Sequence, residues 1–442
     1  MKRYMTGWIG LGMLLTNIPT LHAASLADAV NAARGHDAGI GAAQNAQLAG
    51  RESRWQGLAG LLPRAQLEGS YVRQDQPRAS YAAAVRRHQA TATLTQPLFD
   101  VSRLAGYRRG LASAALADID FSRALQQLTL DVADAYFEVL YQRDVLQAAG
   151  SARQAFQRER DRATAALALG DGTRTELDEA QANLDHALAR EVSAQTDLDI
   201  ASGTYRRLTG LPAAEAAPVA WECQPAAPAV ELSALLDDAA RGNLDVQAAT
   251  YALERARADV GVAVGANLPV AELQASYGSR WSRGAGQNAL DELFGTTSKS
   301  RSSTIGVTVT VPLFAGGAQL SATREAMRRR DEARDVLEDA RRKAQEGARA
   351  AWLGVSSGDA LVHAQQRALA SADSRVRSTR LGRQVGLRTS LDELNAQQRY
   401  FESQRDLAAA RYKQLRARLQ LAAALGTLGD ADVEAVACQP RA

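Results

Sequence analysis

The feature that most constrains this 442-residue chain is an internal duplication. Short motifs of the first half recur in the same order in the second half, at offsets of 206 to 216 residues. The shared order and spacing predict two copies of one unit, each with the order helix, strand, loop, strand and very long helical hairpin. The matched motifs are Leu62-Pro63 and Leu268-Pro269, Pro97-Leu98-Phe99 and Pro312-Leu313-Phe314, Gly170 and Gly386, and Cys223-Gln-Pro and Cys438-Gln-Pro.

Two stretches without proline, residues 98–211 and 313–439, predict the helical hairpins. Both are rich in residues that favour helices, and their apolar positions follow the heptad rhythm of a coiled coil. A helix of about 65–70 residues, rising about 1.5 Å per residue, is about 100 Å long. Each stretch breaks once, near residues 170–172 and near Gly386. The seam positions are Leu125, Leu128, Val132, Ala135 and Val139, then Leu391, Leu394, Phe401, Ala408, Tyr412, Leu415 and Leu419.

Four short segments alternate apolar residues with small polar residues, which is the period-two pattern of β-strands. We interpret them as two hairpins, whose strands are joined by residues 74–88 and 281–303. One face of each strand is apolar, and the other carries Thr, Ser, Gln or Gly. The segments lie at residues 67–71, 90–95, 273–277 and 304–311.

The N-terminus predicts export from the cytoplasm. Lys2 and Arg3 precede a short apolar run and a small-residue cleavage site at Ala23, which together indicate a secretory signal peptide. The run is too short for a membrane anchor. We divide the chain into the signal peptide (1–23), a first repeat (24–217), a Pro-rich linker (218–231), a second repeat (232–428) and a C-terminal tail (429–442).

Composition and motifs argue against several classes of function. The net charge of +3 is near neutral, whereas nucleic-acid binders usually carry a basic patch, so no nucleic-acid partner is expected. The five histidines lack metal-ligand spacing, and no nucleophile and base stand in a recognisable arrangement. We therefore expect no enzyme activity, no metal and no cofactor.

Four strands are too few to close a membrane barrel, since about eight are needed, and an open sheet edge cannot face lipid. Three copies would supply twelve strands and would gather their helical hairpins into a cylinder. The predicted fold is mainly α with a small β part. Its duplicated strand-and-long-helical-hairpin repeat would form a homotrimer, in which a 12-stranded β-barrel is continuous with an α-helical periplasmic tunnel.

These features closely resemble the TolC family of outer-membrane efflux and secretion channels, over essentially the whole mature chain. The resemblance rests on the strand exits at residues 96–100 and 311–317, the segment 385–397 and the closing run 415–428. It implies a passive exit duct of a tripartite export system in the cell outer membrane, serving type I protein or toxin secretion or multidrug efflux. The implied partners are a periplasmic adaptor (membrane fusion) protein, an inner-membrane ABC or proton-driven pump, and outer-membrane lipid.

Two alternatives remain open at this stage. No cysteine lies near the cleavage site to carry a lipid anchor, which favours protein secretion over lipoprotein-type drug efflux. The competing class is a periplasmic coiled-coil adaptor or scaffold of an export complex, which also has long helical hairpins. An adaptor, however, would not show four lipid-compatible strands within a complete duplication.

The resemblance also places a pore gate at the periplasmic ends of the hairpins. Asp392 and Asn395 occupy positions where the family commonly has aspartate rings, so Asn395 weakens the expected cation selectivity. Glu393 would compensate only if it faces the pore. Arg388 matches a cation that bonds to the neighbouring hairpin, here through Thr175 and Glu176. Arg388 could instead pair with Asp392 on its own helix.

The hairpin turns and the two cysteines complete the candidate sites. The resemblance implies that the turns contact the adaptor. It also places both cysteine-bearing segments in a belt around the tunnel, so Cys223 and Cys438 are candidates for a disulfide in the oxidising periplasm. Equivalent positions in two repeats need not be adjacent, so two free thiols remain the alternative. The turn residues are Leu169 and Gly170, and Val385, Gly386 and Leu387.

Overall fold

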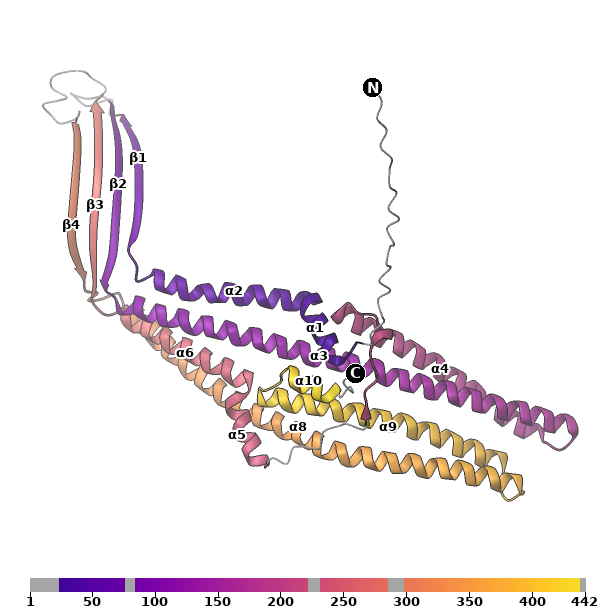
Figure 1. Cartoon of the computed structure of the whole chain (residues 1–442). Coiled ribbons are helices and arrows are strands. Elements are labelled where there is room, and N and C mark those ends of the chain that lie inside the picture. The colour runs from indigo at the N-terminus through magenta and orange to yellow at the C-terminus, as the bar shows by residue number, and fades with distance from the viewer. Residues whose placement is uncertain (1–23, 76–83, 222–230, 285–297, 438–442) are drawn as a thin grey trace, which may run out of the picture.

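The computed structural model describes residues 24–75, 84–221, 231–284 and 298–437. A four-stranded sheet stands at one end of a long helical body (Figure 1). The elements are α1 (Leu26–His36), α2 (Ala38–Ala59), β1 (Arg64–Asp75), β2 (Ala84–Phe99), α3 (Val101–Leu169), α4 (Arg174–Thr209), the 3-10 helix η1 (Ala213–Glu215), α5 (Leu232–Gly242), α6 (Leu244–Gly265), β3 (Val270–Gly284), β4 (Ser298–Thr310), α8 (Ala318–Gln384), α9 (Ser390–Leu425) and α10 (Asp430–Ala437).

The duplication is visible in the lengths of the helices. Helices α1 and α5 have 11 residues each, α2 and α6 have 22 each, and α4 and α9 have 36 each. The long helices α3 and α8 have 69 and 67 residues. At about 1.5 Å per residue both are about 100 Å long, as the heptad pattern predicts. Each unit therefore runs from two short helices through a β-hairpin to a long helical hairpin.

The sheet has the order β1-β2-β3-β4, and every neighbouring pair is antiparallel. The predicted hairpins are thus confirmed, and β2 also pairs with β3 to join the two units. The strands extend further than the sequence pattern predicts, because β1 continues to Asp75 and β4 begins at Ser298. Pro97 lies inside β2 at a shift of register rather than at the end of the strand. Proline cannot donate to the ladder, so the shift fits its position.

Heptad seams hold the helical body together. Leu128, Val132, Ala135 and Val139 of α3 are buried, as are Leu394, Ala408, Tyr412, Leu415 and Leu419 of α9. The predicted seam position Leu391 is wrong, since its side chain is exposed next to the turn. The largest core lies midway along the body. There Tyr136 of α3 is fully buried, and its hydroxyl donates to the carbonyl of Ala217 at 2.7 Å.

Burial around this core affects ionisable groups as well. Loss of solvent raises the pKa of Tyr136, and it also raises the pKa of Asp144, although a bond from the Tyr412 hydroxyl to that carboxylate opposes the change. Within the four described ranges, no helix is both long enough and apolar enough for a membrane span.

Candidate functional site

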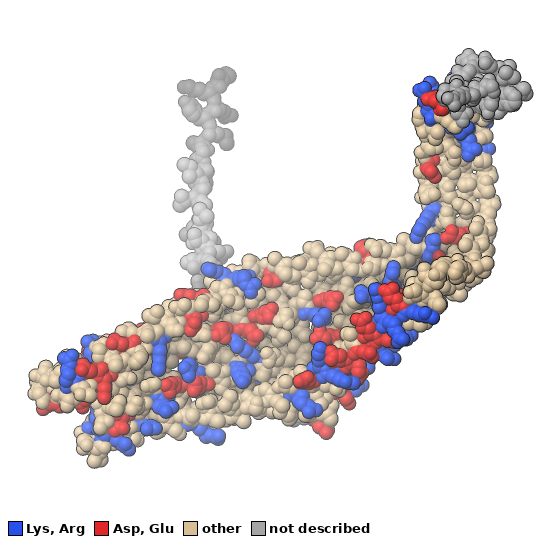
Figure 2. Space-filling view, turned by 180° about the vertical axis from the view of Figure 1, so that it is seen from behind, with Lys and Arg blue, Asp and Glu red and all other residues tan. Residues whose placement is uncertain are grey.

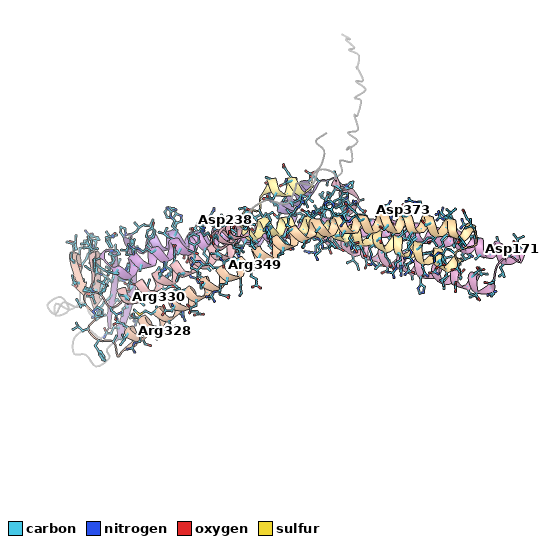
Figure 3. The ribbon with its side chains drawn as sticks, turned by 90° about the horizontal axis from the view of Figure 1, so that it is seen from below. Asp171, Asp238, Arg328, Arg330, Arg349 and Asp373 are labelled. Atoms are coloured by element: carbon cyan, nitrogen blue, oxygen red, sulfur yellow. The ribbon has the colours of Figure 1, made fainter. Side chains whose placement is uncertain are left out.

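The two long hairpins end in turns of the same design at the end of the body remote from the sheet. Gly170 and Gly386 each have positive φ, of 82° and 77°, which glycine adopts without a Cβ clash. Asp171 marks the far end of the first hairpin in Figure 3. Leu169, Val385 and Leu387 are 62–80% exposed at the two turns. Each turn therefore presents apolar side chains to solvent.

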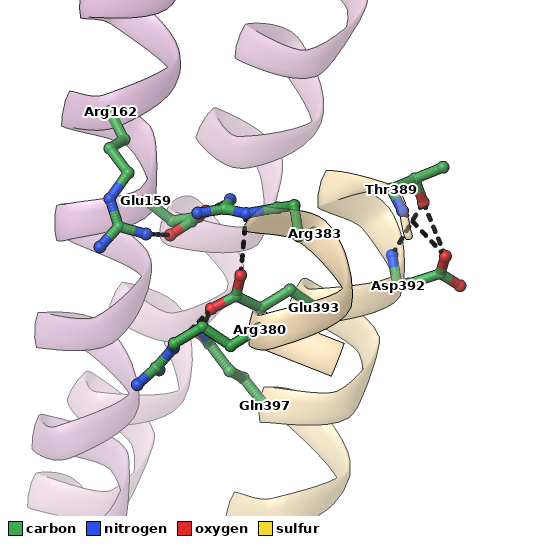
Figure 4. Close-up of polar contacts among 8 residues, drawn as sticks. All are labelled: Glu159, Arg162, Arg380, Arg383, Thr389, Asp392, Glu393 and Gln397. Carbon is green, nitrogen blue, oxygen red and sulfur yellow. Dashed lines mark hydrogen bonds and ion pairs between the residues drawn. The ribbon is translucent and has the colours of Figure 1, made fainter. Parts of the chain in front are cut away.

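Each hairpin returns through a capping box. The Thr173 hydroxyl accepts from the backbone N–H of Glu176, and the Glu176 carboxylate accepts from the N–H of Thr173 at 2.9 Å. Thr389 and Asp392 repeat the arrangement at the start of α9, with 3.1 Å between the Thr389 nitrogen and the Asp392 carboxylate (Figure 4). These bonds satisfy N–H groups that have no partner within the helix.

The predicted gate residues all lie at these two turns. Asp392 and Asn395 are in the first turns of α9, and Thr175 and Glu176 are in the first turn of α4. Bonds from the backbone and then the hydroxyl of Thr389 lower the pKa of the Asp392 carboxyl, and the charge of Arg388 adds to the effect. The carboxylate is therefore ionised at neutral pH.

Arg388 is exposed, and within the described part of the chain it forms no ion pair. The alternative pair with Asp392 is not formed, and the bonds that the Asp392 carboxylate accepts come from Thr389. Its predicted bonds to Thr175 and Glu176 are also not formed within one chain, since Glu176 is engaged by Thr173. Gly382 lets Arg388 lie against α8, because a Cβ there would stand 2.8 Å from the Arg388 Cγ. Those bonds therefore stay a prediction for neighbouring chains.

Behind the turns lies a buried ionic cluster that the sequence did not predict (Figure 4). We call the residues Glu159, Arg162, Arg380, Arg383, Glu393 and Gln397 the tip cluster. Glu393 of α9 is fully buried, and its carboxylate is 3.0 Å from both the Arg380 Nε and the Arg383 Nε of α8. Glu393 therefore cannot supply a second acidic ring at a pore.

The tip cluster connects the two hairpins. The Arg383 guanidinium also contacts the buried carboxylate of Glu159 on α3, which takes a second bond from Arg162 at 2.8 Å. Gln397 donates to Glu393 at 3.1 Å. Buried carboxylates are costly unless they are paired, and Arg383 pairs with one such carboxylate from each hairpin. An apolar contact between Phe156 of α3 and Phe401 of α9 lies beside it.

A duplicated chain with an open four-stranded sheet and two helices about 100 Å long, each folded back at a glycine turn, has the architecture that the sequence predicts for an outer-membrane channel protomer. A sequence profile described as outer membrane efflux protein matches residues 29–211 and again residues 235–427. The chain belongs to this family. The predicted class is confirmed: the chain is an outer-membrane exit duct of an export system. The family match excludes the alternative class, a periplasmic coiled-coil adaptor or scaffold.

Individual relatives match most of the length of the chain. Alkaline protease secretion protein AprF of Pseudomonas aeruginosa is 32% identical over 451 residues, covering 99% of this chain and 91% of AprF. Outer membrane protein TolC of Escherichia coli K12 is 29% identical over 383 residues, covering 85% and 77%. The crystal structure of the outer membrane protein VceC from Vibrio cholerae has the same fold, with a TM-score of 0.76 at 20% identity, covering 91% and 96%.

Proposed function

We propose that three copies of this chain form the exit duct of a type I protein secretion system. The observation that supports this choice over drug efflux is the end-to-end likeness to a protease secretion protein, at 32% identity over 99% of the chain. The duct itself is passive, and a partner in the inner membrane supplies the energy.

The sheet supports the trimer. Strands β1 and β4 are exposed along their whole length, and each leaves one edge without a partner among the described residues. Unpaired backbone groups cannot face lipid, so each edge needs a neighbour. Pairing of β4 with β1 of the next chain closes twelve strands after three copies. The same symmetry gathers six helical hairpins around one axis.

The hairpin turns support the gate and the adaptor contact. In a trimer, three copies of Asp392 and Asn395 would surround the axis at the periplasmic entrance. Arg388 would meet Thr175 and Glu176 of the neighbouring hairpin and hold the entrance closed. Leu169, Val385 and Leu387, which are exposed together with the turn glycines, would receive the periplasmic adaptor, which in turn binds an inner-membrane ABC pump.

The experiment tests whether this chain can replace the outer-membrane duct of a known secretion system. A strain that has a protease-secreting ABC pump and adaptor but lacks its own duct receives this chain, and extracellular protease activity is measured. Secretion restored to the level of the native duct supports the proposal. A parallel strain lacking its drug-efflux duct is tested for drug resistance. Restored resistance without protease secretion would assign the chain to drug efflux instead.

The control is a turn variant, Leu387→Asp, which charges one of the exposed apolar contacts and leaves the sheet untouched. It should reach the outer membrane as a trimer and yet fail to restore secretion. Full secretion by this variant would contradict the adaptor contact at the second hairpin turn.

A further inference from the structure

The two faces of the sheet differ in chemistry, and the apolar one faces lipid in the proposed channel. The part of this face nearest the helices carries apolar side chains, together with Tyr277 and Ser303. Gln96 is the exception, and its amide bonds to backbone carbonyls. We call this the lipid face. Cross-strand register gives its lower rows as Ala271 and Val309; Gln96, Leu273 and Val307; Ala65, Leu94, Ala275 and Ile305; and Leu67, Ala92, Tyr277 and Ser303.

The lipid face is tall enough to cross the membrane. The path from Ala271 to Trp281 on β3 advances about 3.4 Å per residue, or about 34 Å along the strand. With the usual tilt of about 40° the height is about 26 Å, close to the apolar band of outer-membrane barrels. The helices are periplasmic, so the row at Trp281 lies at the outer surface of the membrane.

An aromatic row occupies this outer level. Tyr71, His88 and Trp281 stand directly opposite one another on three adjacent strands. Their ring centroids are 4.9 Å apart in both pairs. Aromatic side chains gather where hydrocarbon meets headgroups, so this row marks the outer headgroup level independently of the height.

Immediately beyond the aromatic row, three arginines are aligned across the same three strands. Arg73 is opposite Arg86, and Arg86 is opposite Arg283. Strands lie about 4.8 Å apart, and like charges placed directly opposite destabilise a sheet. On β4, Lys299 lies opposite Trp281 in the aromatic row, and Arg301 lies opposite Ser279, one row nearer the helices, so two further cations lie on the lipid face within two rows of the arginines. The five residues Arg73, Arg86, Arg283, Lys299 and Arg301 are the basic belt.

The basic belt lacks counter-charges within the described part of the chain. Asp75 is the one acid of the described strands on this face, and it is 3.3 Å from Arg73. Arg86, Arg283, Lys299 and Arg301 are exposed and form no ion pair within that part. Figure 2 shows charges crowding the helical body, whereas the sheet is mostly uncharged and Lys and Arg reappear near its far end. A row of like charges of this kind is stabilised by an anion from outside the chain.

We propose that the basic belt binds phosphate groups of the phosphorylated glycolipid, lipopolysaccharide, in the outer leaflet. Arginine binds phosphate in a bidentate manner, and three aligned guanidiniums suit a headgroup with more than one phosphate. The aromatic row below would contact the sugar and the start of the acyl chains. This inference rests on the proposed trimeric channel, because only a closed barrel presents the lipid face to the membrane.

The test measures lipid binding to the purified trimer by native mass spectrometry. The probes are diphosphoryl lipid A, the same lipid A after phosphatase treatment, and phosphatidylglycerol. The wild type should prefer diphosphoryl lipid A over both. The double variant Arg86→Gln/Arg283→Gln should bind it about tenfold more weakly or worse, since two charge-assisted bonds are removed.

The matched control is Arg87→Gln/Arg280→Gln, which removes the same charge from the opposite face, one residue and three residues nearer the helices than the Arg86–Arg283 row. Its affinity for lipid A should be unchanged. Equal losses in the two double variants, or equal binding of all three lipids by the wild type, would overturn the inference. A trimer that conducts ions but shows no such preference refutes this inference alone, whereas failure of the wild type to form a trimer refutes both it and the proposed function.

Discussion

Replacing Arg383 by glutamine should loosen the second hairpin from the first. Arg383 is the one residue of the tip cluster that contacts carboxylates on two different helices, Glu159 of α3 and Glu393 of α9. The variant Arg383→Gln removes the positive charge while keeping a polar side chain. The buried carboxylates of Glu159 and Glu393 then each lose one positively charged partner.

The size of the effect follows from the partners that remain. Removing one partner of a buried ion pair costs about 3–5 kcal/mol when the other charge is left alone. Here Glu159 keeps Arg162, and Glu393 keeps Arg380 and Gln397. The Arg383 side chain is also 23% exposed, so solvent screens part of its charge. We expect a loss of about 2 kcal/mol in docking free energy, or about a thirtyfold rise in the undocked population.

Two measurements report the undocking of the second hairpin from the first. Hydrogen exchange of backbone amides at the start of α9 reports the free energy of local opening. Single-channel conductance in planar bilayers reports whether undocking widens the entrance, and it should rise in Arg383→Gln. The control is Arg377→Gln, because Arg377 lies on the same helix but its side chain bonds to Asp373 and Ser374 of that helix. It should change neither measurement.

A double-mutant cycle with Glu159→Gln isolates the connection between the hairpins. The coupling energy between Glu159 and Arg383 should be at least about 1 kcal/mol. A coupling near zero, together with a conductance equal to that of Arg377→Gln, would refute the reasoning. The tip cluster would then be a product of packing with no part in the docking of the hairpins.

Three further predictions concern the turns and the cysteines. Arg388→Glu should raise single-channel conductance by breaking the closing bonds to the neighbouring hairpin, and an unchanged conductance would remove Arg388 from the gate. The Asp392 carboxyl has a lowered pKa, so its capping contribution is present above the ordinary carboxyl pKa of about 4 and is lost as pH falls through the lower folded value. The protection of the first amides of α9, relative to their intrinsic exchange rates, should therefore fall only in acid, and Asp392→Asn should abolish this pH dependence of the protection. Cys223 and Cys438, which lie outside the described residues, should resist thiol labelling in unreduced protein, whereas two reactive thiols would exclude the disulfide.

Much of the fold was predictable because it follows from periodicity. Proline-free stretches with heptad seams gave the long helices, and period-two segments gave the four strands. The ends of the strands were less predictable. The stretch from Ser298 to Ser303 is polar on both faces, so its sequence resembles a loop, and it is held in the sheet by backbone pairing with β3.

The tip cluster was not predicted because its signal is weak in a single sequence. Glu159 and Glu393 are buried acids of α3 and α9, at depths where an apolar residue is normal, but mixed charges are common throughout both helices. Which carboxylate meets which arginine depends on how two hairpins distant in sequence dock. The turns were easier, since glycine with threonine three residues later is a local signature of a helix end and a helix start.

The open edges of β1 and β4 have a consequence for inheritance. In the proposed trimer each chain pairs with the sheets of both neighbours. A chain whose strand edge cannot pair therefore prevents closure of the barrel in every trimer that contains it. If half of the chains in a cell carry such a damage, only about one eighth of the trimers contain three intact copies. Mutations at the strand edges should therefore be dominant, whereas a chain that never folds leaves the intact copies free to assemble.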